Sequence, residues 1–144
     1  MEEFTIFYAK PQFSRDLNCS AEEAKKSSPA LFEMASKAPS NTHVPLATIR
    51  VNKIEEVYSI MQGEHWSSGD RQADAQEMIQ DAGLTHTSMK MGDLVLSHDS
   101  GVLYFCDYVG FTRIGYYHGE AGKELSRMDL PKINDLYPII HGFG

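Results

Sequence analysis

Long apolar runs and cysteines are both scarce in this sequence. No apolar run approaches the roughly twenty residues that a membrane-spanning helix needs. The N-terminal segment MEEFTIFYAK begins with acidic residues, where a signal peptide would begin with basic ones. The two cysteines, Cys19 and Cys106, form no C-x-x-C motif. We therefore expect a cytoplasmic protein without membrane contact and with two free, mostly buried thiols.

Basic residues are also in short supply. The chain has 13 Lys and Arg against 20 Asp and Glu, a formal net charge of −7 at pH 7, and its longest basic run is Lys25-Lys26. Direct nucleic-acid binding is not expected, because phosphate contacts need clustered basic side chains. The acidic balance would suit a partner with a positive surface. The acidic residues are scattered, however, and ordinary solubility explains the charge equally well.

Catalytic and metal-binding motifs are missing too. The sequence has no phosphate-binding P-loop, dinucleotide fingerprint or G-x-S-x-G motif. No histidine has the spacing of a metal ligand, so all are predicted to be solvent-exposed loop residues: His43, His65, His86, His98, His118 and His141. A nucleophilic Cys106 would need a base such as His86 or His98, but its apolar surroundings favour a buried thiol. We predict no catalytic residues, no metal, no cofactor and a non-enzymatic protein.

The C-terminal half contains a dense pattern of strands and turns. The apolar LVL segment after Gly92-Asp93 predicts a short strand, and HDSG, residues 98–101, predicts a hairpin turn. The segment VLYFCDYV is apolar enough for a central strand that is covered on both faces. After a break at Gly110, FTRIGYY predicts a third strand. The three strands form an antiparallel meander.

The N-terminal half predicts further strands and several helices. β-Branched and aromatic residues indicate strands at residues 4–10 and 46–51. Capping residues and helical spacing of apolar residues predict helices at residues 20–26, 28–38, 53–62 and 71–83. Gly63 and Gly83 are expected to end the last two. The fold class is therefore α+β: a small antiparallel sheet, made of the C-terminal meander plus one or two N-terminal strands, packed by two to four short helices.

The length of the chain fits a single α+β domain, residues 1–144. We expect a core module at residues 47–117 and a C-terminal extension at residues 118–144. The extension includes a weakly helical segment, AGKELSRM, and ends in the apolar segment LYPIIHGFG. Exposed apolar segments of this kind are unfavourable in water, so the extension should either pack on the core or form an interface, for which a homo-oligomer is one form.

Two segments, SMKMGDLVL and YFCDYVGF, carry a family resemblance. Their pattern is a Ser-x-x-x-Gly-Asp step, a short apolar strand, Tyr-x-Cys and a Gly-aromatic pair. It falls on Ser88, Gly92, Asp93, Tyr104 (or Phe105), Cys106, Gly110 and Phe111. With the upstream ATIRVNKIEEVYSIMQ, the chain resembles the YodL-like family of small domains of phages, plasmids and other mobile elements, over residues 47–115. The resemblance implies an accessory protein of the host cell cytoplasm and brings no catalytic residues.

Several side chains are candidates for a binding site: Trp66, Asp93, Tyr104, Tyr108, Arg113 and Tyr117. Trp66 lies in a polar interhelical segment, where tryptophan serves either as an interface residue or as an anchor to the core. Asp93 is either a ligand contact or a turn residue that accepts backbone N–H groups. In the Tyr116-Tyr117 pair, strand alternation should direct one ring inward and the other to the surface.

The leading functional hypothesis is a non-enzymatic accessory protein of a phage or mobile element that binds and modulates or inhibits a host protein. The first alternative is a protein that binds a small molecule, such as a nucleotide, in a pocket lined by Tyr104, Tyr108, Arg113 and Trp66. A virion or assembly component is the second. An enzyme whose site is assembled from distant segments is the third.

Overall fold

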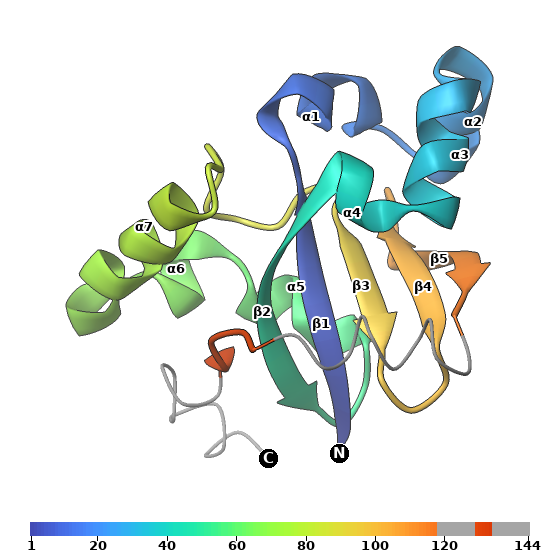
Figure 1. Ribbon diagram of the computed structural model, residues 1–144. Helices are drawn as coiled ribbons and strands as arrows, with labels where there is room; N and C mark the ends of the chain where they lie inside the picture. The colour runs from blue at the N-terminus through green and yellow to red at the C-terminus, as the bar shows by residue number, and fades with distance from the viewer. Residues whose placement is uncertain (118–128, 134–144) are drawn as a thin grey trace.

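The centre of the molecule is a five-stranded antiparallel sheet with strand order β2-β1-β3-β4-β5 (Figure 1). The computed structural model describes residues 1–117 and 129–133. The strands are β1 (Glu2–Ala9), β2 (His43–Val51), β3 (Leu94–Ser97), β4 (Val102–Cys106) and β5 (Phe111–Tyr116). The predicted α+β class, both N-terminal strands and the C-terminal meander are confirmed.

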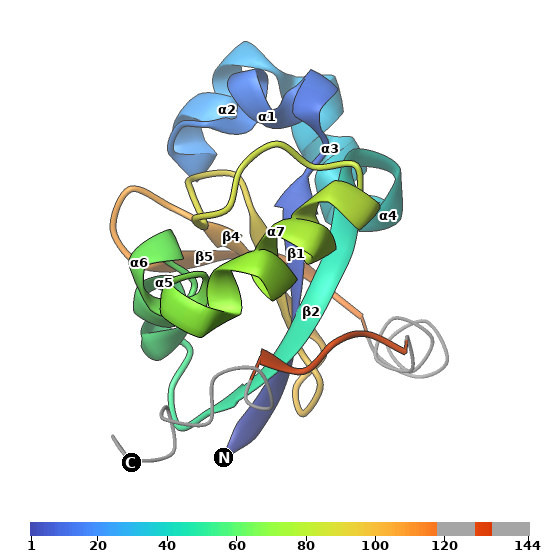
Figure 2. The same cartoon turned by 90° about the vertical axis from the view of Figure 1, so that its left-hand side faces the viewer.

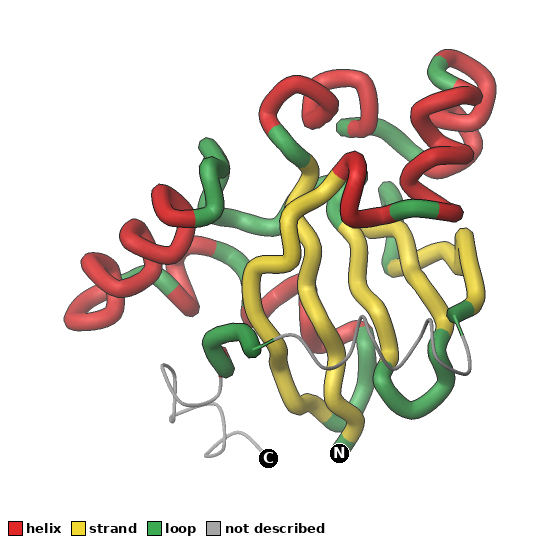
Figure 3. Tube along the Cα trace, viewed as in Figure 1, coloured by secondary structure: helices red, strands yellow, loops and turns green. Residues whose placement is uncertain are grey.

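The first strand occupies a position that its place in the chain does not suggest. β1 lies between β2 and β3, and it is hydrogen-bonded to both (Figures 1 and 3). The predicted core module, residues 47–117, therefore lacks one central strand of the sheet. The pairing of β1 with β3 joins the N-terminus to the meander. β1 also contributes apolar side chains to the cores on both faces of the sheet.

Helices are shorter and more numerous than the two to four that were predicted. The described residues contain seven α-helices and one 3₁₀-helix: α1 (Pro11–Leu17), α2 (Ala21–Ser27), α3 (Pro29–Lys37), α4 (Pro39–Thr42), α5 (Glu55–Ile60), α6 (Gly63–Trp66), η1 (Gly69–Arg71) and α7 (Gln72–Asp81). Proline is the first residue of α1, α3 and α4, a position where its missing N–H costs little. Helices α1 and α4 lie between the predicted elements: α1 follows the predicted strand at residues 4–10, and α4 follows the predicted helix at residues 28–38.

Local capping signals were partly correct. The Ser20 hydroxyl accepts the backbone N–H of Glu23 at 3.1 Å, so it caps α2 as predicted. Gly83 has a φ of 70° and follows α7, which fits the predicted left-handed stop. Gly63 does not end α5 in this way. It begins α6, and its N–H donates to the Ser88 hydroxyl at 2.7 Å.

Each face of the sheet is covered by its own apolar core. Helices α5, α6 and α7 lie over one face (Figure 2). There they bury Val57, Met61 and Trp66 against Ile6 and Ile49 of the sheet. The second core joins residues of α1, α2 and α3 to residues of β1, β3 and β4: Leu17, Ala21, Ala24, Phe32, Ala35, Phe7, Leu94, Leu96, Leu103 and Phe105. The expectation of a strand covered on both faces is confirmed for Val102–Cys106. It is wrong for the end of the predicted segment, because Tyr108 and Val109 lie in an exposed turn beyond the strand.

A short part of the C-terminal extension packs on β2. The backbone N–H of Thr48 donates to the carbonyl of Pro131 at 2.9 Å, and Ile133 is fully buried. The extension thus contacts the core at residues 129–133. The predicted helix at residues 121–128 and the apolar segment proposed for homo-oligomer contact lie outside the described residues. No helix in the described part of the chain combines the length and apolar character needed to cross a bilayer.

Gly92 is required by close packing as well as by backbone conformation. Its φ is 95°, and a Cβ at this position would lie 2.4 Å from the carbonyl oxygen of Leu17. The opposing atom belongs to backbone, so it cannot move aside as a flexible side chain would. The Gly-Asp step of the sequence is therefore a point where the chain passes directly against the end of α1.

We expect Gly92→Ala to lower the free energy of unfolding by about 3 kcal/mol or more, since the left-handed conformation alone costs about 1–2 kcal/mol and the backbone clash adds to it. Gly83→Ala is the matched control: its φ is 70°, but nothing lies within 4 Å of the added Cβ. That variant should lose about 1 kcal/mol. Urea unfolding of both proteins measures the difference. Equal losses would contradict the packing role of Gly92.

Candidate functional site

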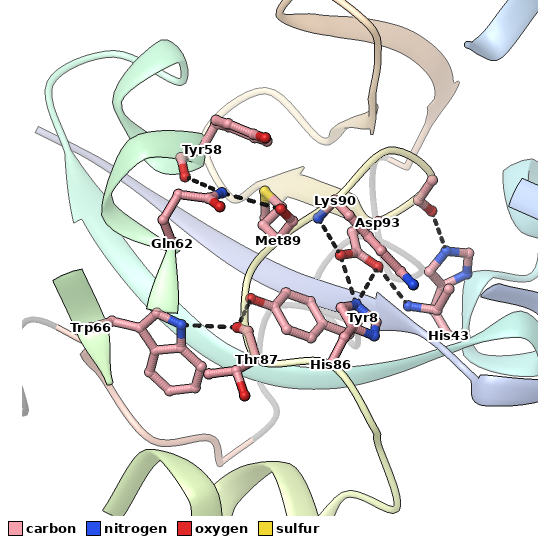
Figure 4. A network of polar contacts seen from close by, with 12 residues as sticks. Tyr8, His43, Tyr58, Gln62, Trp66, His86, Thr87, Met89, Lys90 and Asp93 are labelled. Atoms are coloured by element: carbon pink, nitrogen blue, oxygen red, sulfur yellow. Dashed lines mark hydrogen bonds and ion pairs between the residues drawn. The ribbon is translucent and has the colours of Figure 1, made fainter. Parts of the chain in front are cut away.

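The carboxylate of Asp93 is fully buried and accepts hydrogen bonds from three directions (Figure 4). Oδ1 accepts the backbone N–H of Ala9 at 2.8 Å, and Oδ2 accepts that of Lys90 at 2.9 Å. The Nε2–H of His86 donates to Oδ2 at 2.9 Å and lies 3.1 Å from Oδ1. The predicted turn contact, with Lys90, is present. The contacts with β1 and His86 come from distant segments, and together they make Asp93 an interior anchor.

The loop before Asp93 is fastened to the helices by its backbone. The carbonyl of Thr87 accepts the hydroxyl of Tyr8 at 2.8 Å and the indole N–H of Trp66 at 3.0 Å. The side-chain amide of Gln62 donates to the carbonyl of Met89 at 3.1 Å. The loop of residues 84–93 is thereby held against both β1 and α6 (Figure 4).

His86 and Asp93 resemble the histidine–carboxylate pair of many hydrolases, in which the carboxylate orients a base. Here the free ring atom, Nδ1 of His86, is buried and has no hydrogen-bond partner. The ring of Tyr8 stacks on the imidazole, with centroids 4.4 Å apart and planes 13° apart. A substrate cannot reach Nδ1 without displacing protein atoms, so the arrangement fits an interior support and not a proton-transfer site.

The prediction that the histidines are solvent-exposed loop residues is wrong for His43, which lies in a strand, and for His65, which lies in α6. His86 and His98 lie outside helices and strands, as predicted, but are only partly exposed. His43 is fully buried at the start of β2. Its Nε2–H donates to the carbonyl of Gly92 at 2.7 Å, and Nδ1 lies 2.6 Å from the hydroxyl of Thr42. Burial lowers the pKa of His43, since the protonated ring would lose its hydration. The sequence could not reveal this, because β2 and the Gly-Asp turn meet only in the folded chain.

The remaining histidines stay apart from this network where they are described. His98 lies in the β3–β4 turn and its Nε2 is 2.7 Å from the hydroxyl of Thr5. His65 lies in α6, where Nδ1 is 2.6 Å from the carbonyl of Ser59. His118 and His141 lie outside the described residues. Within residues 1–117 and 129–133, no three histidine, cysteine or acidic side chains come together as metal ligands would.

Cys106 is a buried thiol, and Cys19 is also free, as predicted. Burial, followed by the charges of Asp93 and Asp107, raises the pKa of Cys106 to about 12. The thiol therefore stays protonated at neutral pH, and nucleophilic chemistry requires the thiolate. Its backbone is structural as well: its N–H donates to the carbonyl of Asp93, and its carbonyl accepts the N–H of Gly92.

An open groove lies on the surface between α5 and the β4–β5 turn. It has a volume of about 570 Å³, and the residues that line it are Glu55, Tyr58, Met91, Asp107, Tyr108, Val109, Gly110 and Phe111. At its rim Tyr108 is 81% exposed and Val109 is 82% exposed. Tyr58 of α5 adds a third exposed apolar side chain. Glu55 and Asp107 are the acidic residues of the lining. The Asp107 carboxylate itself accepts the hydroxyl of Thr112 and, at 3.4 Å, the N–H of Ala21 at the start of α2.

The turn that presents Tyr108 and Val109 is fixed by Asp107. Oδ1 of Asp107 accepts the N–H of Tyr108 at 2.6 Å, and Oδ2 accepts the hydroxyl of Thr112 at 2.5 Å. The N–H of Asp107 also donates to the carbonyl of Gly110 at 2.9 Å. A fixed turn loses little conformational freedom when it binds, so exposed apolar groups on it are favourable contact residues.

The six candidate residues do not form one site. Tyr108 lines the groove, whereas Arg113 is exposed on β5 and lines a different groove, beside α2 and α3. Trp66 and Asp93 are buried and serve as anchors of the loop. Tyr104 packs partly buried against the first core, and Tyr117 packs against the second and donates to the carbonyl of Ser36. Tyr116 is exposed while Tyr117 is half-buried, in agreement with the predicted alternation.

Of the residues that line the groove only Tyr108 was among the candidates, and seven were not: Glu55, Tyr58, Met91, Asp107, Val109, Gly110 and Phe111. Tyr58 lies in the helix predicted at residues 53–62, next to Val57 and three residues before Met61. The latter two are buried, whereas Tyr58 is 45% exposed. A large aromatic residue at the edge of the apolar face of a helix is a candidate for surface contact. The sequence does not show, however, which turn of the folded chain it faces.

Comparisons with models of known protein families, with curated proteins and with solved structures find no match. The protein has a small α+β fold. The resemblance to the YodL-like family stays an expectation.

We expect Asp93→Asn to lower the free energy of unfolding by about 2–4 kcal/mol, because an amide cannot accept all of the buried N–H groups and each unsatisfied one costs about 1–3 kcal/mol. The exposed Asp70 of η1 supplies the control variant Asp70→Asn, expected to change stability by no more than about 0.5 kcal/mol. Chemical denaturation gives the energies, and hydrogen exchange at Ala9 and Lys90 reports the lost acceptor. Unchanged exchange at both amides would rule out the anchoring role.

The buried His43 predicts loss of stability in mild acid. Its pKa is lowered in the folded state, so below the ordinary value of about 6.5 the unfolded chain binds a proton that the folded chain does not. Stability should fall as the pH drops from 7 to 5. His43→Gln keeps a donor for the Gly92 carbonyl but does not titrate, so its pH dependence should be flatter. His98 contributes in the same direction and remains in both proteins. Identical slopes would refute the assignment to His43.

Proposed function

We propose that this protein is a small non-enzymatic binding protein that docks on another protein through the groove between α5 and the β4–β5 turn. The observation that carries the proposal is the pair Tyr108-Val109, more than four-fifths exposed on a turn that is fixed by internal hydrogen bonds. Exposed aromatic residues with rigid backbones are common hot spots of protein interfaces. Unexplained apolar exposure of this kind is costly unless a partner covers it.

The biological setting follows from the resemblance to small domains of mobile elements. We infer an accessory protein of a phage or mobile element, acting in the host cytoplasm by binding and modulating or inhibiting a host protein. The net charge of −7 and the carboxylates of Glu55 and Asp107 favour a partner with a positive surface.

A nucleotide is a less suitable ligand for the same groove. Its volume of about 570 Å³ would accommodate a small molecule. However, Glu55 and Asp107 would repel phosphate groups, and Arg113 is not among the residues that line it. The interior network around Asp93 offers no replacement, because its polar atoms are already engaged by the protein.

The double variant Tyr108→Ser/Val109→Ser tests the proposal. Both side chains are exposed, so the fold should be retained while binding to a stoichiometric partner from host lysate weakens by at least about tenfold, corresponding to roughly 1.4 kcal/mol. Met34→Ser is the matched control, since Met34 is an exposed apolar residue of α3 that does not line the groove. Quantitative affinity capture followed by titration with the purified partner gives the ratio.

Two results would count against the proposal. Equal binding by the double variant and by wild type would place the interface elsewhere. Failure of the wild-type protein to retain any stoichiometric partner would argue against a binding function through this surface.

A further inference from the structure

The β5 strand forms one border of the sheet. Its ladder partner is β4, and in the described part of the chain no strand pairs with its other edge. Near its end the strand is covered by α3: a Cβ on Gly115 would lie 2.9 Å from the carbonyl oxygen of Ser36, and the hydroxyl of Tyr117 donates to the same oxygen. The segment of residues 111–114 lies before this covered end.

The orientation of the backbone in this segment follows from the hydrogen bonds of β4. Phe111 is paired with Cys106, but the N–H and carbonyl of Cys106 are both engaged on the opposite side, with Asp93 and Gly92. Phe111 is thus in a non-hydrogen-bonded pair, and its own N–H and carbonyl point away from β4. The alternation of an antiparallel ladder predicts the same for Arg113, whereas Thr112 faces its partner Phe105.

A groove lies on each face of the sheet beside this segment. Phe111 lines the groove under α5 and belongs to the first core. On the opposite face a second groove, of about 320 Å³, is formed between α2, α3 and β5 by Ala21, Glu22, Lys25, Phe32, Thr112, Arg113 and Ile114. Outward-pointing backbone groups flanked by two grooves match what an added strand requires, since its side chains alternate between the two faces.

We propose that an extended segment of the partner protein adds to the edge of β5 at residues 111–114 and places alternate side chains in the two grooves. The proposal rests on the proposed function, because it specifies how the partner is recognised. The ladder hydrogen bonds with Phe111 and Arg113 would provide affinity, and the grooves would provide specificity.

The chemistry of the first groove defines the segment. Met91, Tyr108 and Val109 favour an aromatic or long aliphatic side chain, and the carboxylate of Glu55 favours a neighbouring lysine or arginine. The occupant is therefore an extended segment with alternating apolar and basic residues. A second copy of the chain is disfavoured, because two protomers would each bring a net charge of −7 and the same acidic groove to the contact.

The experiment uses a displayed library of random ten-residue peptides selected on the full-length protein. We expect selected peptides to be basic and apolar with two-residue periodicity, and to protect the amides of Phe111 and Arg113 from hydrogen exchange. Arg113→Pro should weaken their binding by at least about tenfold, because proline removes a ladder donor and its ring obstructs the added strand. Arg113→Ala, which keeps the N–H, is the matched control and should bind within about twofold to threefold of wild type.

A second pair of variants tests the charge requirement. Glu55→Gln should weaken binding of the basic peptides by about twofold to fivefold at low salt. Glu64→Gln changes an exposed glutamate of α6 that does not line the groove, and it should have no effect. The difference between the two variants should shrink as the ionic strength rises.

Each outcome decides the proposal. If Arg113→Pro fails to fold, amide protection in the wild-type protein provides the decision. Absence of selected peptides, peptides that protect other amides, equal binding by the proline and alanine variants, or dimers that form through β5 would overturn strand addition. The proposed function has its own readout: if Tyr108→Ser/Val109→Ser loses the partner while Arg113→Pro retains it, the groove binds a partner in another way.

Discussion

The carboxylate of Asp93 is the constraint on which the rest of the structure depends. A buried charge is tolerated only when hydrogen bonds replace its hydration, and here the donors come from β1, from the Lys90 turn and from His86. Satisfying one carboxylate therefore fixes three segments relative to one another. The carbonyl of Asp93 also accepts the N–H of Cys106, so the same residue sets the register between β3 and β4.

The titratable side chains of the interior are part of the contacts that hold the fold together. His43 and His86 are held by hydrogen bonds, Cys106 is protonated, and burial raises the pKa of Tyr8 well above its ordinary value, with the charge of Asp93 adding to the effect. The free nitrogen of His86 is enclosed under the ring of Tyr8. Since these groups are committed to the interior, the features available for recognition are on the surface, in the grooves beside β5.

Sequence reasoning succeeded where the signal was local. The meander followed from turn residues such as those before β4, and α2 followed from the capping spacing of Ser20 and Glu23. It failed where the decisive partner was distant. The central position of β1 and the burial of His43 depend on pairings between segments more than thirty residues apart. No residue pattern within a short window contains that information.

The candidate site shows the same division. Tyr108 was among the candidates as an aromatic pocket residue, but its segment was predicted to be a buried strand, so its 81% exposure in the turn was not predicted. Tyr58 and Met91 were missed, since they meet the turn only after the loop of residues 84–93 has been fastened by Asp93. Met91 lies between two anchored neighbours, Lys90 and Gly92, and Asp107 directly follows the anchored Cys106.

The hydrogen-bond network around Asp93 and the surface groove are therefore connected, because the network holds segments that line the groove. The exposed side chains of Tyr108 and Val109 contribute nothing to the core, and exposed apolar groups of this kind reduce solubility. Their presentation in a fixed geometry lowers the entropy lost on binding, and that benefit requires a rigid support beneath them. The buried carboxylate provides this support through Cys106 and the turn that follows it. A sheet whose edge and grooves are positioned in this way is better suited to recognising an extended chain than to enclosing a small ligand.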